Sequence, residues 1–192
     1  MSPRTKAQFE EIREAATERI LNSALEVFGT YGYESATISQ IARHAGISKG
    51  LIYNYFSSKE DLLKSLIDNL IQHESSLMTE IYHQDASRFL ENIIRYSFRE
   101  IRENSHQWKL ITSLTMQLER YEFIHDLAVN KLRSYLQLFE KLLTEIGFSN
   151  AREEACILAA LFDGIGIQSL IVREDYDLDF YENYFIEKYC KS

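Results

Sequence analysis

The side chains between Lys49 and Asn54 have the chemistry needed to read a DNA groove. Lys49 carries positive charge, and Tyr53 and Asn54 carry hydrogen-bonding groups. Gly50 lets the backbone come close to a phosphate or a base. The residues spaced to face inward, at least in part, are Leu51, Ile52, Tyr55 and Phe56. The segment therefore predicts a short helix with an apolar inner face and a polar outer face suited to the major groove.

Two capping boxes bracket this short helix and predict the helices on either side of it. Thr37 and Gln40 form a T-x-x-Q box that marks the start of the preceding helix. Ser57 and Glu60 form an S-x-x-E box that opens the following helix. Both boxes pair a hydroxyl with a side chain three residues later, which satisfies backbone N–H groups at a helix start.

A tight turn is predicted between the first two of these helices. Gly46 can adopt the left-handed conformation that ends a helix, and Ser48 can cap the next one. A helix, a short turn and a second helix follow the helix-turn-helix plan, in which the second helix enters the major groove.

At this point the sequence resembles the tetracycline-repressor-like (TetR) family. The resemblance is carried by Ile20 to Phe28, Gly32-Tyr33, Thr37 to Phe56 and Lys59 to Leu63, roughly the first third of the chain. It implies a homodimeric, all-helical regulator with a ligand-controlled C-terminal domain. The DNA-contacting positions that it implies are Thr37, Ser48, Lys49, Gly50, Tyr53, Asn54, Tyr55 and Lys59. A plain structural bundle is the alternative interpretation, and the Lys, Gly, Tyr and Asn outer face weighs against it.

The charge of the chain is unevenly distributed. The formal net charge is -8, yet residues 1–60 hold seven Lys/Arg and seven Asp/Glu, whereas residues 61–192 hold 14 and 22. The acidic surplus thus belongs to the C-terminal part. DNA binding must use a local patch, in which Arg43 joins Lys49 and Lys59, and affinity for random DNA should be modest.

An all-α fold of about nine helices follows from the periodicity of apolar residues and the absence of alternating β-branched runs. We expect a helix-turn-helix DNA-binding domain over residues 1–57, with residues 1–11 as a polar arm. A helical effector-binding and dimerisation domain should cover residues 58–192. The sequence predicts its helices at about 58–82, 88–103, 107–118, 122–146, 150–173 and 180–190.

The C-terminal two-thirds of the chain suggests two further surfaces. The segment 155–167 is apolar nearly all round and must be buried on most sides. The family resemblance places a dimer interface on the last two helices, and the candidates there are Ala160, Gly164, Ile167, Phe180 and Tyr184. An ordinary core helix is the alternative. The candidates for a pocket that takes a small apolar or aromatic effector are Phe98, Trp108, Met116, Tyr121, Phe139, Phe162 and Asp163, each of which is alternatively a core residue.

Other kinds of chemistry find little support in the sequence. The five histidines are scattered and lack metal spacing, and no nucleophile elbow or phosphate-binding loop occurs, so we expect no enzyme, metal or cofactor. Cys156 and Cys190 are expected to be small buried hydrophobes in a reducing cytoplasm. No apolar run reaches the length of a membrane span.

The interpretation that we take forward is a sequence-specific transcriptional regulator. We expect a repressor that is released from a palindromic double-stranded DNA operator by a small effector. The alternative is a helical protein-interaction module with a vestigial DNA-binding domain, which the near-neutral N-terminal part motivates.

Overall fold

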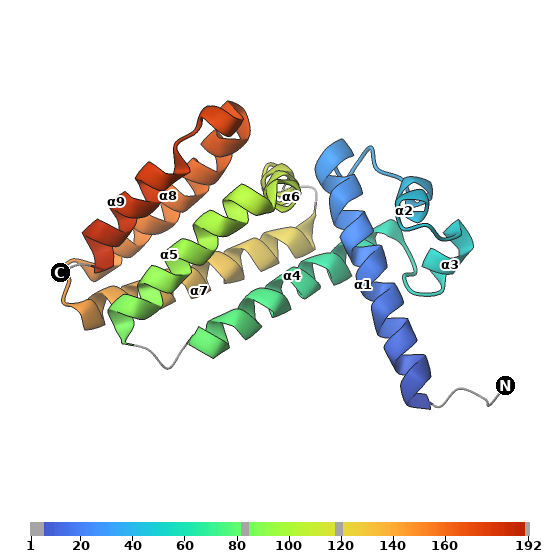
Figure 1. Cartoon of the computed structure of the whole chain (residues 1–192), viewed down its shortest axis with the longest axis horizontal. Helices are drawn as coiled ribbons and strands as arrows, with labels where there is room; N and C mark the ends of the chain where they lie inside the picture. Colours follow the sequence, from blue (N-terminus) through green and yellow to red (C-terminus); the bar gives the residue numbers. More distant parts are fainter. Residues whose placement is uncertain (1–5, 82–84, 118–120, 191–192) are drawn as a thin grey trace. The chain divides into compact units, whose positions relative to one another are not determined.

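The computed structural model describes residues 6–81, 85–117 and 121–190 and is helical throughout that part of the chain (Figure 1). The α-helices are α1 (Lys6–Tyr31), α2 (Ile38–His44), α3 (Lys49–Tyr53), α4 (Lys59–Ile81), α5 (Ala86–Glu103), α6 (Ser105–Thr115), α7 (Glu122–Ile146), α8 (Ala151–Val172) and α9 (Leu178–Cys190). A 3-10 turn, η2 (Arg173–Asp175), follows α8. No strand occurs in these described ranges, so the predicted all-α class is confirmed.

The chain divides into two compact units, Met1–Glu74 and Ser75–Ser192, which we name the N-terminal unit and the C-terminal unit. The division falls within α4, whereas the sequence suggested a domain boundary at residue 57. Leu62, Leu63 and Leu66 of α4 are fully or almost fully buried. These leucines belong to the N-terminal unit and close its core.

The N-terminal unit is built around apolar residues that recur at helical spacing. Its buried residues include Ile20, Ala24, Val27 and Phe28 of α1, Ile38, Ile41 and Ala42 of α2, and Ile52 of α3. Only Ile52 is buried among the five residues of α3. Such a short helix is not stable alone, so its position depends on this one anchor and on its caps.

Local signals place the turns of the N-terminal unit. Thr37 and Gln40 form the predicted capping box at the start of α2. Gly46 has φ +65°, a left-handed conformation that strains residues with a Cβ, and its N–H donates to the carbonyl of Arg43. The chain therefore leaves α2 sharply, and α3 begins three residues later.

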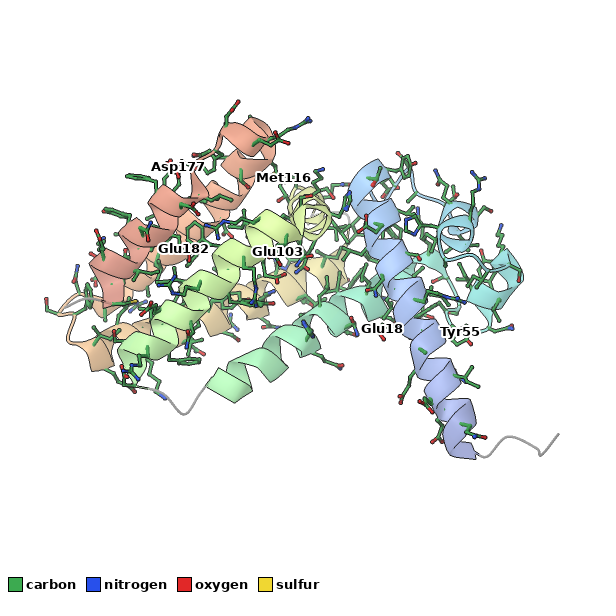
Figure 2. All side chains as sticks on the ribbon, viewed as in Figure 1. Glu18, Tyr55, Glu103, Met116, Asp177 and Glu182 are labelled. Atoms are coloured by element: carbon green, nitrogen blue, oxygen red, sulfur yellow. The ribbon has the colours of Figure 1, made fainter. Side chains whose placement is uncertain are left out.

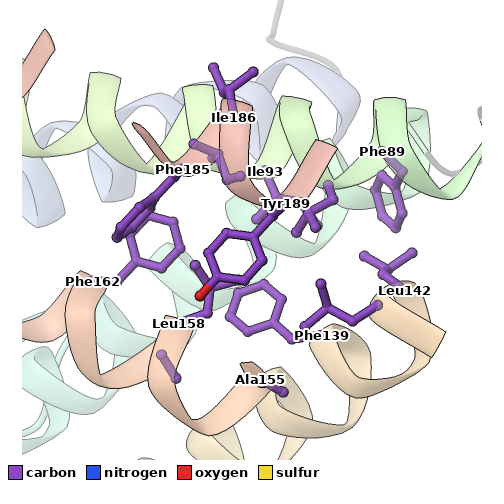
Figure 3. Close-up of a cluster of buried hydrophobic side chains, with 14 of the residues drawn as sticks. Phe89, Ile93, Phe139, Leu142, Ala155, Leu158, Phe162, Phe185, Ile186 and Tyr189 are labelled. Atoms are coloured by element: carbon purple, nitrogen blue, oxygen red, sulfur yellow. The ribbon is translucent and has the colours of Figure 1, made fainter. Parts of the chain in front are cut away.

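An aromatic cluster fills the centre of the C-terminal unit (Figure 3). The ring of Phe162 from α8 lies 5.8 Å from Phe98 of α5, 6.3 Å from Phe139 of α7 and 5.2 Å from Phe185 of α9, measured between ring centroids. Because four helices each supply one ring, burial of this cluster joins them into one core.

Ion pairs connect α9 to α5 and to α8. The guanidinium of Arg102 on α5 lies 2.6 Å from Asp179 and 2.7 Å from Glu182, and Figure 2 labels Glu182 on α9. The ammonium of Lys188 donates to Glu154 of α8 at 2.8 Å, and the hydroxyl of Tyr189 donates to the same carboxylate at 3.0 Å. Hydrogen bonds from Lys188 and Tyr189 lower the pKa of Glu154, while burial opposes them.

Three details differ from the sequence expectation. The first helix begins at Lys6, so part of the expected polar arm is helical; residues 1–5 lie outside the described residues. The cap of α4 is shifted by one residue: Ser58 accepts from the N–H of Asp61, and the Asp61 carboxylate accepts from the N–H and hydroxyl of Ser57. Cys156 is exposed and Cys190 is only partly buried, so the expectation of two buried cysteines was wrong.

Candidate DNA-binding surface

The outer face of α3 is polar and solvent-exposed. The Ser48 hydroxyl accepts from the N–H of Leu51 at 3.2 Å and so caps the helix. Ile52 anchors the opposite side, which directs the predicted side chains outward. Those exposed residues of the helix and its C-cap are Lys49, Gly50, Tyr53 and Asn54, and the exposed fraction of Tyr53 is 48%. The exposed side chains are the ones that the sequence analysis assigned to the outer face of this helix.

Positive charge gathers at both sides of the turn before α3. Arg43 and His44 occupy the last turn of α2 and are exposed. Lys49 opens α3, and its ammonium lies 6.0 Å from the centroid of the Tyr53 ring. A cation over an aromatic face is weakly attracted to it, so Lys49 and Tyr53 form one amphipathic unit at the surface. This charge could meet DNA phosphates on either side of a groove.

Thr37 is exposed, but its side chain is committed to the cap of α2. Its hydroxyl donates to the Gln40 side chain at 2.8 Å and accepts from the Gln40 N–H at 3.2 Å. Its own N–H also donates to the Gln40 side chain, at 2.8 Å. A phosphate that contacts Thr37 must therefore share donors that the cap already uses, which makes Thr37 a weaker candidate than Ser48.

Tyr55 contacts Arg13, a residue that the sequence analysis did not name. The guanidinium of Arg13 on α1 lies 5.7 Å from the centroid of the Tyr55 ring, and Figure 2 labels Tyr55 beside α1. The stacking places an arginine next to the end of the recognition segment. No local signal could have found this pair, because the two residues are 42 positions apart in the sequence.

Lys59 does not extend toward solvent as a phosphate ligand would. It is partly buried, and its ammonium donates to backbone carbonyls of the loop between α1 and α2. The position of this ammonium therefore does not support a direct contact with a DNA phosphate, and any role of Lys59 in DNA binding needs another physical explanation.

Acidic side chains limit the positive field of the N-terminal unit. Glu10, Glu11, Glu14 and Glu18 are all exposed on the first turns of α1. They offset the arginines and lysines of the same unit, as the neutral charge count of residues 1–60 requires. Non-specific attraction to DNA therefore comes from the local patch at α2 and α3 and not from the unit as a whole.

Most of the predicted effector residues lie in or beside the aromatic core. Phe98, Phe139 and Phe162 are buried and contact one another. Trp108 of α6 packs on α8, where its ring covers Gly166 so closely that an added Cβ would lie 2.7 Å from the ring. The structure thus brings these four side chains into one region of the C-terminal unit.

The other predicted effector residues are more accessible. Met116 is 72% exposed at the end of α6, and Tyr121 makes an edge contact with the ring of Phe123 at 6.3 Å. Asp163 reaches solvent, yet partial burial raises the pKa of its carboxyl, while the positive charge of Lys131 opposes that shift. Met116 and Asp163 are exposed and Tyr121 is partly buried, so none of the three is held in the packed core.

A shallow cavity of about 230 Å³ lies elsewhere in the C-terminal unit. It is lined by Asp85, Ala86, Ser87, Glu145, Ile146 and Cys190. The Ser87 hydroxyl closes one side of it by donating to the carbonyl of Cys190 at 2.6 Å. None of the predicted effector residues lines this cavity.

An apolar face is exposed on α8 and α9, which lie side by side in Figure 1. Phe180 is 59% exposed and Tyr184 48% exposed, and their rings stack with centroids 6.5 Å apart. Among the other predicted interface residues, Ala160 is exposed, and Gly164 and Ile167 are partly buried. The structure adds two exposed side chains that the sequence analysis did not name, Ile157 and Leu161. Large apolar side chains exposed in this number on two neighbouring helices are typical of a surface that a partner covers.

Within the described residues, no group of three or more His, Cys, Asp or Glu side chains is arranged to hold a metal ion. One segment there, Ala151–Asp175, is long and apolar enough to cross a membrane by length and composition. The core helix of a soluble protein passes the same test, so this segment alone is weak evidence for a membrane span.

The fold and the exposed face of α3 define a helix-turn-helix DNA-binding protein. A sequence model described as "Bacterial regulatory proteins, tetR family" matches residues 20–66. The HTH-type transcriptional regulator BetI of Serratia proteamaculans (strain 568) is 31% identical over 160 residues, which cover 80% of each chain. The fatty acid metabolism regulator protein of Bacillus subtilis (strain 168) is 30% identical over 132 residues, 66% of each chain.

Solved structures show the same fold. A transcriptional regulator from Saccharomonospora viridis in complex with choline superposes with a TM-score of 0.79 at 24% identity, covering 91% of this chain and 96% of that one. FadR from Bacillus subtilis in complex with stearoyl-CoA gives a TM-score of 0.68 at 24% identity, covering 90% and 97%. The chain belongs to the tetR family of bacterial regulatory proteins and is a DNA-binding transcriptional regulator, as its sequence predicted.

Proposed function

We propose that the chain acts as a homodimeric repressor that leaves a palindromic operator when a small molecule binds its C-terminal unit. The observation that carries the DNA-binding part is the outer face of α3, where Lys49, Gly50, Tyr53 and Asn54 are exposed over the single buried anchor Ile52. Lys49 supplies phosphate contacts, and Tyr53 and Asn54 supply contacts to base edges. Asn54 is the better candidate for selectivity, because a carboxamide can pair with adenine in the major groove.

The apolar face of α8 and α9 supports the homodimer. Phe180, Tyr184, Ile157 and Leu161 leave apolar surface in water that a second copy of the chain would cover. A twofold contact there would present two α3 helices to successive major grooves about 34 Å apart. The palindromic operator follows from this symmetry.

The effector region is proposed beside Trp108, Tyr121 and Asp163, next to the aromatic core. Two structurally similar regulators were solved in complex with choline and with stearoyl-CoA, and the two ligands make different demands on this region. A quaternary ammonium group could pair with Asp163 and an aromatic face, whereas an acyl chain would have to separate the packed Phe rings. Because a packed core resists insertion, we favour a small cation of the choline type over a long acyl chain.

The experiment that tests this function is selection of operator sequences from a random duplex pool at two salt concentrations. We expect a palindromic consensus with half-sites one helical turn apart. Asn54→Ala should relax selectivity at one base position by about 1–3 kcal/mol. Weak retention that depends only on salt, without any consensus, would instead favour the interaction-module alternative.

The same material tests the effector. Trp108 is the single tryptophan of the chain, so its fluorescence reports on the proposed region without added label. Choline is expected to change this emission and to release the operator, with stearoyl-CoA as the comparison ligand. Release by stearoyl-CoA and not by choline would contradict our preference for a cation. We also infer that the chain catalyses no reaction and acts in the cytoplasm, as its regulator relatives suggest.

A further inference from the structure

The ammonium of Lys59 is saturated by backbone carbonyls. Its Nζ atom donates to the carbonyl oxygens of Tyr33 at 2.9 Å, Ala36 at 3.1 Å and Glu34 at 3.2 Å. An ammonium has three N–H donors and no acceptor, so these three bonds use its full capacity. The same atom lies over the Tyr33 ring, 4.5 Å from its centroid, which adds a cation–π contact.

The loop that supplies these carbonyls is itself firmly shaped. Gly32 ends α1 with φ +76°, and its carbonyl accepts from the N–H of Ala36 at 3.1 Å. The Tyr33 ring packs edge-on against Phe28 with centroids 5.2 Å apart. The three carbonyls converge on one point, and the Lys59 ammonium occupies that point.

The position of the loop links Lys59 to the DNA-binding helices. Ala36 is followed directly by Thr37, the N-cap of α2, and Lys59 is the first residue of α4. A bond between Lys59 and the loop thus ties the start of α4 to the start of α2. Because α3 lies between these two ends and holds one buried anchor, its orientation depends on how firmly they are joined.

We propose that Lys59 is a positioning residue for operator recognition: it locks the loop between α1 and α2 onto α4 and does not bind phosphate. The inference rests on the proposed function in assuming that α3 reads an operator. It separates Lys59 from Lys49, which the sequence alone grouped together. Lys49 stands in solvent, whereas a phosphate could reach the Lys59 ammonium only by displacing a carbonyl.

The salt dependence of DNA binding distinguishes the two roles. Each phosphate contact by a lysine contributes about 0.9 to the slope of log K against log salt concentration. The variants are Lys59→Met, Lys59→Arg and, as the matched control, Lys49→Met, each measured on random duplex and on the selected operator. We expect Lys49→Met to reduce the slope by about 0.9 on both duplexes. Lys59→Met should leave the slope unchanged and lower the preference for operator over random DNA by about tenfold or more, comparable with the loss of one base contact.

Lys59→Arg separates charge from geometry. A planar guanidinium keeps the charge but cannot direct donors at three carbonyls around one point, so we expect it to lose operator preference as Lys59→Met does. A slope reduced by about 0.9 in Lys59→Met and restored in Lys59→Arg would show a phosphate ligand and would overturn the proposal.

Amide hydrogen exchange gives a readout that needs no operator. The N–H groups of Gln40 and Ile41 donate to the carbonyl of Thr37 at the start of α2. In Lys59→Met these amides should exchange at least about tenfold faster, while those of the core of α1 keep their protection. Unchanged exchange at α2, or an equal loss of protection in both helices, would refute the positioning role. If the wild-type protein selects no operator, the proposed function fails, whereas this exchange result still decides whether Lys59 holds α2.

Discussion

The contact between Trp108 and Gly166 predicts that a single added methyl group destabilises the C-terminal unit. In Gly166→Ala the new Cβ would lie 2.7 Å from one atom of the Trp108 ring and 2.9 Å from another. Distances below van der Waals contact force the ring or the helix to move, which costs about 1–3 kcal/mol in a packed interior. Alanine recovers about 1 kcal/mol of helix propensity relative to glycine. The net effect on the free energy of unfolding should be a loss of about 0–2 kcal/mol.

The sign of the effect should reverse when the ring is removed. In a Trp108→Leu background, the atoms that would meet the new Cβ are gone. Gly166→Ala should then stabilise by up to about 1 kcal/mol through helix propensity alone. The assay is urea unfolding followed by far-UV circular dichroism, at one fixed protein concentration because association contributes to stability. The coupling between the two substitutions should be about 1–3 kcal/mol.

Gly164 provides the matched control on the same helix. Apart from the adjoining backbone of α8, no atom of the described residues lies within 4 Å of the Cβ that Gly164→Ala would add, so its effect should be the same in both Trp108 backgrounds. Equal effects of Gly166→Ala in the two backgrounds would refute the reasoning, because they would show that the Trp108 ring does not occupy the space beside Gly166.

Three further predictions concern DNA binding, pH and thiol reactivity. Gly50→Ala should leave stability unchanged or slightly higher, since nothing lies within 4 Å of its added Cβ, but should weaken operator binding in a gel-shift assay; unaltered binding would argue against close backbone approach at α3. Hydrogen bonds from the N–H and hydroxyl of Ser57 lower the pKa of Asp61, so its stabilising effect is complete above about pH 4 and is lost as the pH falls through the depressed value. Asp61→Asn should therefore lower the urea midpoint at pH 7, and the difference from wild type should shrink at pH 3; an equal difference at both pH values would contradict this. Burial raises the pKa of the Cys190 thiol to about 12, so iodoacetamide at pH 7.5 should modify Cys190 slowly in the folded protein and faster after unfolding, whereas the exposed Cys156 serves as the control. Peptide mass analysis that finds Cys190 labelled as fast as Cys156 in the folded protein would disprove the assignment.

Local signals in the sequence were sufficient for the helices and most of their ends. The Thr37–Gln40 box and the glycine cap at Gly46 depend on residues within a few positions of one another, and both occur in the structure. The predicted cap of α4 was misplaced by one residue because Ser57 and Ser58 are neighbours and both carry a hydroxyl group. Only the hydrogen bonds that Asp61 makes with each of them distinguish the two serines. Single-residue errors at helix ends are the expected limit of pattern-based inference.

Contacts between distant residues could not be inferred in the same way. Lys59 meets carbonyls 23–26 positions earlier, and backbone carbonyls leave no mark in a sequence. The aromatic residues proposed for the effector show a related limit. A sequence does not distinguish phenylalanines that line a pocket from phenylalanines that fill a core. Only the ring–ring distances show that Phe98, Phe139 and Phe162 pack together.

The balanced charge of residues 1–60 has a consequence for how many molecules a cell would need. A genome offers about 10⁶–10⁹ random sites that compete with one operator, and a strongly basic regulator is largely sequestered on them. Here the exposed glutamates of α1 offset the positive charges, so fewer copies should be held by random DNA. A small population of this regulator would then keep its operator occupied, and an effector would have few molecules to remove before transcription responds.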